Sequence, residues 1–297
     1  AAEAFAEEQR FDDAADALNS AIDLDAAAVP AASVASLVRS SEAASPIRKL
    51  AHRLLESAIR ARSRTRALVI ATALLEHSSE EEGREILRSI AKGAGAAFVV
   101  AVAGAHADWL IERERSDDAD ALADFVTDLV PNSPEAWWLS SQLHRKAGRG
   151  QPAAEAALKA ARLFNEAGAV TEEESCYREA LEQFPNNIPV LETLAYFYDR
   201  EKRMEDALTV MKRLARLTAE AQDYQSSANW LRKILAHTPN DDESREQIVD
   251  VLLRLHRNDE AAGHLLELAR SFSKKGDEDK AERTYVRLLE VEPDNEQ

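Results

Sequence analysis

The segment ALEQFPNNIPVLETLAYFYDREKRMEDALTVMKRLAR, residues 180–216, decides the fold, because it shows how one helix ends and how the next begins. Its FPNN step contains Pro185, which lacks the amide hydrogen that a helix interior needs. The step also contains Asn187, a residue type that favours helix starts. Apolar side chains at Leu191 and Tyr198 then recur at helical spacing. The segment predicts helices joined by short turns.

Pro185 is one of four prolines that recur at intervals of 54 residues, the others being Pro131, Pro239 and Pro293. Small residues at Ala153, Ala207 and Ala261, and an Ala-Arg pair at 161–162, 215–216 and 269–270, keep the same interval without a gap. These coincidences predict an internal duplication. We expect a single domain over 1–297 with repeats at about 1–26 (partial), 27–77, 78–131, 132–185, 186–239 and 240–293.

Stop and start signals predict three helices in each repeat. In the third complete repeat, Ser133 is a cap before a first-turn proline, and Gly148 ends that helix. Gly168 then stands where a helix end needs a left-handed residue. The run Thr171–Glu174 has the pattern of a capping box that opens the third helix.

The repeat endings ESCYREALEQFP and KAERTYVRLLEVEP resemble the tetratricopeptide repeat (TPR) family, with Tyr177, Ala180 and Pro185 at its aromatic, small and proline positions. The similarity covers essentially the whole chain, most clearly from residue 131 onward. It implies an all-α, right-handed α-solenoid of TPR-like antiparallel helices. The chain departs from the family in its period, since TPR repeats have about 34 residues and two helices. Strict alternation of three helices per repeat between two layers would place equivalent helices of neighbouring repeats on opposite layers.

Composition excludes several classes of partner. Lys plus Arg total 37 against 54 Asp plus Glu, and the net charge of −17 argues against a general nucleic-acid or anionic-membrane binder. The most apolar run, residues 93–105, is shorter than the roughly 20 residues that a bilayer requires. The lone Cys176 excludes an intrachain disulfide and a multi-cysteine metal site. A cytoplasmic location fits this cysteine usage.

The sequence contains no pattern for catalysis or cofactor binding. It lacks the phosphate-binding, dinucleotide-binding, zinc-protease and nucleophile-elbow motifs. Its seven histidines include no pair at i, i+4 spacing, which argues against a helical metal site. We therefore predict no catalytic, cofactor-binding or metal-binding residue, and a protein that is not an enzyme.

Two features are candidate binding surfaces. The segment 46–66 is strongly basic, and Arg53, Arg60 and Arg64 can share one helical face. An acidic segment of a partner is the predicted ligand, and a solvated face is the alternative. The candidate residues of this segment are Arg53, Arg60, Arg62, Arg64 and Arg66.

The second feature is aromatic and comprises Trp137 and Tyr196, with Arg200 one helical turn beyond the tyrosine. Consecutive helical residues point about 100° apart, so the rings 196–198 cannot all face one neighbour. Partner contact and internal packing are the two interpretations. The carboxylate clamp of the TPR family needs Lys and Asn, which are absent from the helix 188–200, so the resemblance does not carry the clamp over.

Two hypotheses about function remain open. The first is a non-catalytic scaffold or adaptor that recruits a protein or peptide, as TPR similarity implies. Bacterial signalling, motility or secretion assemblies are the expected context, since the Ala-, Arg- and Asp-rich composition suggests a GC-rich genome. The alternative is a regulatory or sensor TPR region of a larger enzyme or transcription regulator, because the chain opens inside a repeat.

Overall fold

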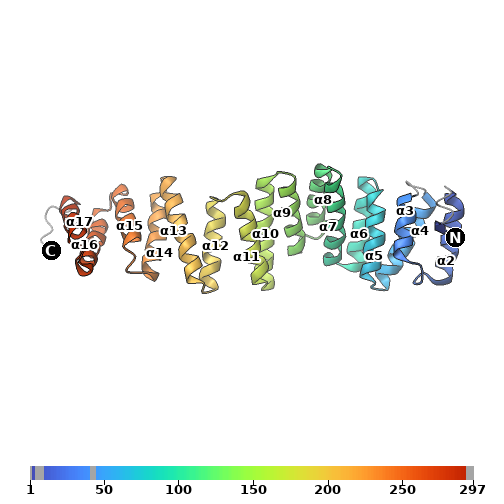
Figure 1. The fold of residues 1–297 in the computed structure, drawn as a ribbon, viewed down its shortest axis with the longest axis horizontal. Coiled ribbons are helices and arrows are strands. Elements are labelled where there is room, and N and C mark those ends of the chain that lie inside the picture. Colours follow the sequence, from blue (N-terminus) through green and yellow to red (C-terminus); the bar gives the residue numbers. More distant parts are fainter. Residues whose placement is uncertain (1, 4–9, 41–44, 292–297) are drawn as a thin grey trace. The chain divides into compact units, whose positions relative to one another are not determined.

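The computed structural model describes residues 2–3, 10–40 and 45–291 (Figure 1). Sixteen α-helices, α2 to α17, are bounded within these ranges, which contain no strand. The all-α class predicted from the sequence is confirmed. Contacts divide the chain into two compact units, unit 1 (Ala1–Gln183) and unit 2 (Phe184–Gln297). The division falls at the FPNN step, and a single domain over 1–297 stays a prediction.

Unit 1 consists of helices joined by short turns. Its helices are α2 (Phe11–Asp25), α3 (Ala31–Ser40), α4 (Ser45–Arg60), α5 (Arg64–Glu76), α6 (Glu80–Ala94), α7 (Ala96–Glu112), α8 (Ser116–Leu129), α9 (Pro134–Lys146), α10 (Gly150–Ala167) and α11 (Val170–Gln183).

Helices α2 to α9 form two layers within unit 1. Helices α3, α5, α7 and α9 contact one another in series, and so do α2, α4, α6 and α8. Strict alternation predicts this arrangement. Helix α7 lies inside it, against α5, α6, α8 and α9, and Val99, Val102, Ala103 and Ala107 are fully buried. The apolar side chains of α7 cover most of its circumference, so their burial requires several neighbouring helices, although a stripe that includes Ala105 and Asp108 is exposed.

Unit 2 packs its helices mainly in chain order, each against the one before and the one after. These helices are amphipathic, with one apolar stripe and a charged face. They are α12 (Ile188–Arg200), α13 (Met204–Glu220), α14 (Tyr224–His237), α15 (Asp242–Arg254), α16 (Asn258–Lys275) and α17 (Glu278–Val291).

The helix starts recur along the chain at the interval seen in the sequence. Helices α6, α9, α12 and α15 begin at residues 80, 134, 188 and 242, which are 54 residues apart. Each start is capped by the preceding side chain, which accepts a hydrogen bond from the third amide of the helix; these caps are Ser79, Ser133, Asn187 and Asp241. Such a cap contributes about 1 kcal/mol to stability. Pro131, Pro185 and Pro239 lie between helices, whereas Pro293 lies outside the described residues.

One predicted helix start is wrong. Helix α11 begins at Val170, so Thr171 lies inside the helix and does not cap it. The main-chain carbonyl of Thr171 accepts a hydrogen bond from Ser175 Oγ at 2.9 Å, as within a regular turn. A capping box is formed instead by Ser79 and Glu82, where α6 begins.

Candidate partner-binding surfaces

The basic segment 46–66 does not form one helix. Helix α4 ends at Arg60, and α5 begins at Arg64 after a turn in which Arg62 has a φ of 56°. The expectation that Arg53, Arg60 and Arg64 share one helical face is therefore wrong. The left-handed residue reverses the chain and places Arg64 on a different helix from the other two.

Arg53 and Arg66 tie their helices to α2. Arg53 Nη1 donates to Asn19 Oδ1 at 2.8 Å, and its Nη2 lies 3.3 Å from Asp23 Oδ1. Arg66 donates to the main-chain carbonyls of residues 26 and 27, just beyond the end of α2, where carbonyls have no helical partner. Both guanidinium groups are engaged within unit 1, so they are less available to a partner than the rest of the segment.

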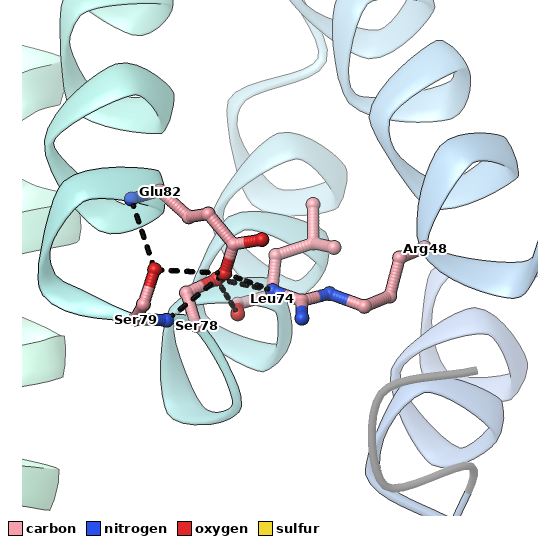
Figure 2. A network of polar contacts seen from close by, with 5 residues as sticks. All are labelled: Arg48, Leu74, Ser78, Ser79 and Glu82. Carbon is pink, nitrogen blue, oxygen red and sulfur yellow. Dashed lines mark hydrogen bonds and ion pairs between the residues drawn. The ribbon is translucent and has the colours of Figure 1, made fainter. Parts of the chain in front are cut away.

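Arg48, in the same segment, is also used internally (Figure 2). Its Nη2 donates to Ser78 Oγ at 2.8 Å and lies 3.2 Å from Glu82 Oε2. Glu82 also accepts from the Ser79 main-chain amide at 3.0 Å, which completes the capping box. Ser78 Oγ donates in turn to the Leu74 carbonyl at 2.6 Å. The network fixes the start of α6 to α4 and to the end of α5.

Arg60, Arg62 and Arg64 remain at the surface. Arg60 lies 3.7 Å from the carboxylate of Glu56, its neighbour on the same helix. Arg62 and Arg64 are exposed, and among the described residues their side chains have no hydrogen bond or ion pair. They line a cavity of about 320 Å³ at the α4–α5 turn, which extends to Gly93 at the end of α6. This arrangement offers unpaired positive charge beside a hollow surface.

The aromatic run on α12 is divided between core and surface. Phe197 and Tyr198 are buried, whereas Tyr196 is 54% exposed. Lys233 of α14 lies 4.4 Å from the centre of the Tyr196 ring and donates to its hydroxyl oxygen at 3.1 Å. The same ammonium stands 4.3 Å from the centre of the buried Trp230 ring. Tyr196 is therefore the one ring of the run that a partner can reach.

The two other aromatic-surface candidates have internal contacts. Trp137 is half-buried, and its Nε1 donates to the Pro131 carbonyl at 2.8 Å. Its ring lines a surface hollow of about 450 Å³ together with His144 and Lys159. Arg200 lies 5.2 Å from the centre of the Phe197 ring, so it covers the core of unit 2. Trp137 remains a candidate contact, and Arg200 has a structural role.

Sequence analysis did not find a buried ionic cluster in unit 1. Asp120, which is 2% exposed, lies 2.5 Å from His144 Nδ1 and 2.6 Å from Arg149 Nη1. The Nε2 atom of His144 lies 3.4 Å from Asp124 Oδ1. These residues come from α8, α9 and the turn before α10, and only the packing of the three brings them together. A search of the sequence for residues one helical turn apart could not detect Asp120 and His144, which are 24 residues apart.

The chemistry of the remaining reactive groups is limited. Burial, reinforced by neighbouring glutamates, raises the pKa of the Cys176 thiol to about 12, so the nucleophilic thiolate is scarce at neutral pH. Within the described ranges, no three His, Cys, Asp or Glu side chains are placed to hold a metal ion. A search of the same ranges finds no helix with the length and apolarity to cross a membrane.

A comparison with protein families finds a helical repeat near the end of the chain. Residues 265–295 match the family model of the tetratricopeptide repeat, over most of the α16–α17 pair and the residues that follow it. The chain is thus a TPR-like helical repeat protein. The match covers one helical pair and leaves the 54-residue repeat a prediction. No curated protein matches the sequence.

Several solved structures resemble the chain at low identity. A Rap protein complexed with Competence and Sporulation Factor is 16% identical over 95% of this chain and 80% of that chain, with a TM-score of 0.31. YrrB, a TPR protein with an unusual peptide-binding site, is 12% identical over 71% and 95%, with a TM-score of 0.22. The P58(IPK) TPR domain is 14% identical over 98% and 96%, with a TM-score of 0.23. At TM-scores this low, the likenesses carry no argument about partners.

Proposed function

We propose that this chain is a non-catalytic protein-binding scaffold that receives an acidic segment of a partner at Arg60, Arg62 and Arg64. These three residues are called the basic turn below. They carry the proposal because Arg62 and Arg64 are exposed, have no ion pair with any described residue and line a cavity. Arg48, Arg53 and Arg66 of the same segment hold helices together instead. TPR-like folds generally mediate protein–protein interaction, which supports this class of function.

Charge complementarity selects the partner. The chain as a whole carries a net charge of −17, so an acidic segment is repelled by most of its surface. The positive charge of the basic turn therefore attracts the acidic segment and determines where on the chain it binds. Guanidinium groups suit this role because they bind carboxylates through two parallel hydrogen bonds.

Composition also supports a proposal about the cellular setting of the protein. We propose that the scaffold acts in the cytoplasm within a bacterial signalling, motility or secretion assembly, to which it recruits its partner. The Ala-, Arg- and Asp-rich composition and the lone cysteine support this context.

A titration with a fluorescein-labelled octaglutamate peptide tests the basic turn. We expect the fluorescence anisotropy of the peptide to rise on addition of the protein, with weaker binding at higher salt because exposed charges are screened. The triple substitution Arg60→Glu, Arg62→Glu and Arg64→Glu should weaken binding at least tenfold. Full retention of binding by this variant would refute the proposal.

A matched control separates the local effect from the change in net charge. Arg216, Arg270 and Lys274 are exposed residues of unit 2, and their replacement by Glu changes the net charge by the same amount. We expect this variant to bind octaglutamate within twofold of the wild type. Equal losses in the two triple variants would show a nonspecific response to total charge, and circular dichroism verifies that each variant is helical.

A further inference from the structure

The cavity at the basic turn is apolar as well as basic. It has a volume of about 320 Å³ and lies where α4 and α6 end and where α5 and α7 begin. A cavity of roughly 150 Å³ is large enough to hold benzene, so this one has room for an apolar side chain. The apolar part of its lining consists of Ala58, Ile59, Ala67, Ala94 and Phe98.

Part of this apolar lining is open to an incoming group. Ile59 and Ala94 are half-buried, whereas Ala67 and Phe98 are buried. Gly93 lets the end of α6 approach α4 closely, because a β-carbon at this position would lie 2.8 Å from Ile59 Cγ2. The cavity is thus bounded by packed helix ends, and a ligand that covers Ile59 and Ala94 removes apolar surface from water.

Among the described residues, no carboxylate lines this cavity. Its charged residues are Arg62 and Arg64, whose side chains have no ion pair with any described residue. The hollow beside Trp137, by contrast, is lined by Asp124 and Glu155. In a chain with a net charge of −17, the cavity at the basic turn therefore combines an apolar wall with uncompensated positive charge. Such a lining fits an apolar group that has carboxylates beside it.

Main-chain hydrogen bonds fix the turn that carries these two arginines. The Arg62 amide donates to the Ile59 carbonyl at 3.0 Å, and the Ser63 amide donates to the Ala58 carbonyl at 2.9 Å. A ligand therefore has to order only the arginine side chains and not the backbone beneath them. A site with its backbone already in place loses less conformational entropy on binding.

We propose that the acidic segment received at the basic turn inserts one apolar side chain into this cavity, while carboxylates of its neighbouring residues pair with Arg62 and Arg64. The occupant is an acidic polypeptide segment with an apolar residue in its middle. That a polypeptide binds here rests on the proposed function, whereas the apolar side chain follows from the lining of the cavity. Apolar contact supplies affinity, and the two arginines select an apolar residue with acidic neighbours.

Two octapeptides with capped ends test the apolar side chain by isothermal titration calorimetry on the whole chain. The first has leucine at its fourth position and glutamate elsewhere, and the second has alanine in place of the leucine. Both are unlabelled, because an aromatic dye would compete for the cavity. We expect the leucine peptide to bind at least about fivefold more tightly, since its larger side chain is removed from water in the cavity. Equal affinities would overturn the proposal.

A third peptide tests whether the carboxylates are needed. It keeps the leucine and has serine in place of every glutamate, so it carries no charge. We expect it to bind at least about tenfold more weakly than the acidic leucine peptide, because it cannot form ion pairs with Arg62 and Arg64. Equal binding would mean that the cavity accepts any exposed apolar side chain, and the proposal would be wrong.

Two alanine substitutions provide a matched pair of variants. Ala94 lines the cavity, so Ala94→Leu should occupy the space of the incoming side chain and lower the affinity of the leucine peptide to that of the alanine peptide. Ala105 is exposed on α7 and lies outside the lining, so Ala105→Leu should leave both affinities unchanged. A folded Ala94→Leu variant that still prefers leucine would contradict the proposal. The comparison of peptides on the wild type does not depend on the folding of either variant.

The triple substitution at the basic turn distinguishes failure of the apolar contact from failure of the proposed function. If the leucine and alanine peptides bind the wild type equally and both lose affinity in the Arg60→Glu, Arg62→Glu, Arg64→Glu variant, the basic turn binds acidic segments without an apolar anchor. Only the inserted side chain is then refuted. If neither peptide loses affinity in this variant, acidic segments bind elsewhere, and both proposals are wrong.

Discussion

Arg149 in unit 1 and Arg203 in unit 2 hold the same backbone position, 54 residues apart, each just before the first residue of a helix. Arg149 binds the buried carboxylate of Asp120, which also contacts His144. Tyr198 stands 54 residues after His144, and the Arg203 guanidinium lies 4.6 Å from the centre of its ring. The same helix arrangement thus carries a buried ionic cluster in unit 1, and in unit 2 a cation–π contact beside an exposed ion pair between Arg203 and Asp206.

The difference shows that the helix boundaries and the contacts between the helices depend on different residues. Caps and turns of similar sequence give the same helix boundaries in both units. The contacts between the helices also depend on single residues, since Tyr198 stands where unit 1 has His144 and places an aromatic ring beside Arg203, which also pairs with Asp206 of its own helix. In unit 1, α7 also packs against α5, α6, α8 and α9, whereas unit 2 packs amphipathic helices mainly in chain order. Four predictions test how far the two units differ.

The largest effect is expected at the ionic cluster. His144→Leu leaves the buried Asp120 with one partner fewer and should lower the free energy of unfolding of unit 1 by about 3–5 kcal/mol. The double change with Asp120→Leu should recover much of this loss, because it removes the buried charge. In unit 2, Arg203→Met removes a cation–π contact and an exposed ion pair with Asp206, and it should cost about 1–2 kcal/mol. Urea-induced unfolding measures all three, and a smaller loss in His144→Leu than in Arg203→Met would contradict the comparison.

Overpacking should affect both units alike. Ala207 in unit 2 and Ala153 in unit 1 are buried at equivalent positions of their helices. Replacement of either by Leu forces neighbouring side chains apart and should cost up to about 3 kcal/mol. Ala236→Leu, at an exposed site, is the control. Equal melting temperatures for Ala207→Leu and Ala236→Leu would show that Ala207 is not a close contact.

The pH dependence of unit 1 should contain a contribution from His106. Burial lowers its pKa to about 4 in the fold, below the value of about 6.5 in the unfolded chain. The folded state therefore binds a proton less readily, so this contribution is present above pH 6.5 and is lost as the pH falls toward 4. Between pH 7 and 4.5, the wild type should lose about 2 kcal/mol more than His106→Gln. Urea-induced unfolding at the two pH values measures both proteins, and equal losses of stability would contradict this contribution.

The smallest effect concerns the turns with left-handed backbone. Gly148 and Lys202 hold equivalent positions, with φ values of 75° and 57°. A side chain is strained in this region, so Lys202→Gly should raise the free energy of unfolding of unit 2 by about 1 kcal/mol. Gly148→Lys should lower that of unit 1 by a similar amount. Thermal unfolding measures both, and a destabilised Lys202→Gly variant would count against this explanation.

Helix ends were largely predictable because their signals are local. Gly148 and Gly168 end helices, and Ser133 and Asn187 cap them, as the sequence indicates. Lys202 was not predictable as a stop, because its left-handed backbone follows from the packing of the helices on either side. The prediction for Thr171 failed because the capping pattern recurs by chance inside an acidic helix.

The candidate sites were less predictable than the helices. Charge density identified the basic segment, but it did not show that Arg53 and Arg66 bind within unit 1 while Arg62 and Arg64 stay unpaired. The order of the aromatic run likewise did not show that Tyr196 is its exposed member. Both distinctions depend on what lies opposite a side chain, and that neighbour is distant in sequence.

The sequence by itself determined an all-helical chain, most of the places where its helices begin and end, and the small residues that lie between them. These features depend on hydrogen bonds and side-chain sizes within a few residues of one another. Only the tertiary structure decided that Asp120 meets His144 and Arg149, and that His106 Nδ1 is buried without a hydrogen-bond partner among the described residues. The energy of a charge or polar group depends on its distance from water and from its partners, which the packing of helices sets.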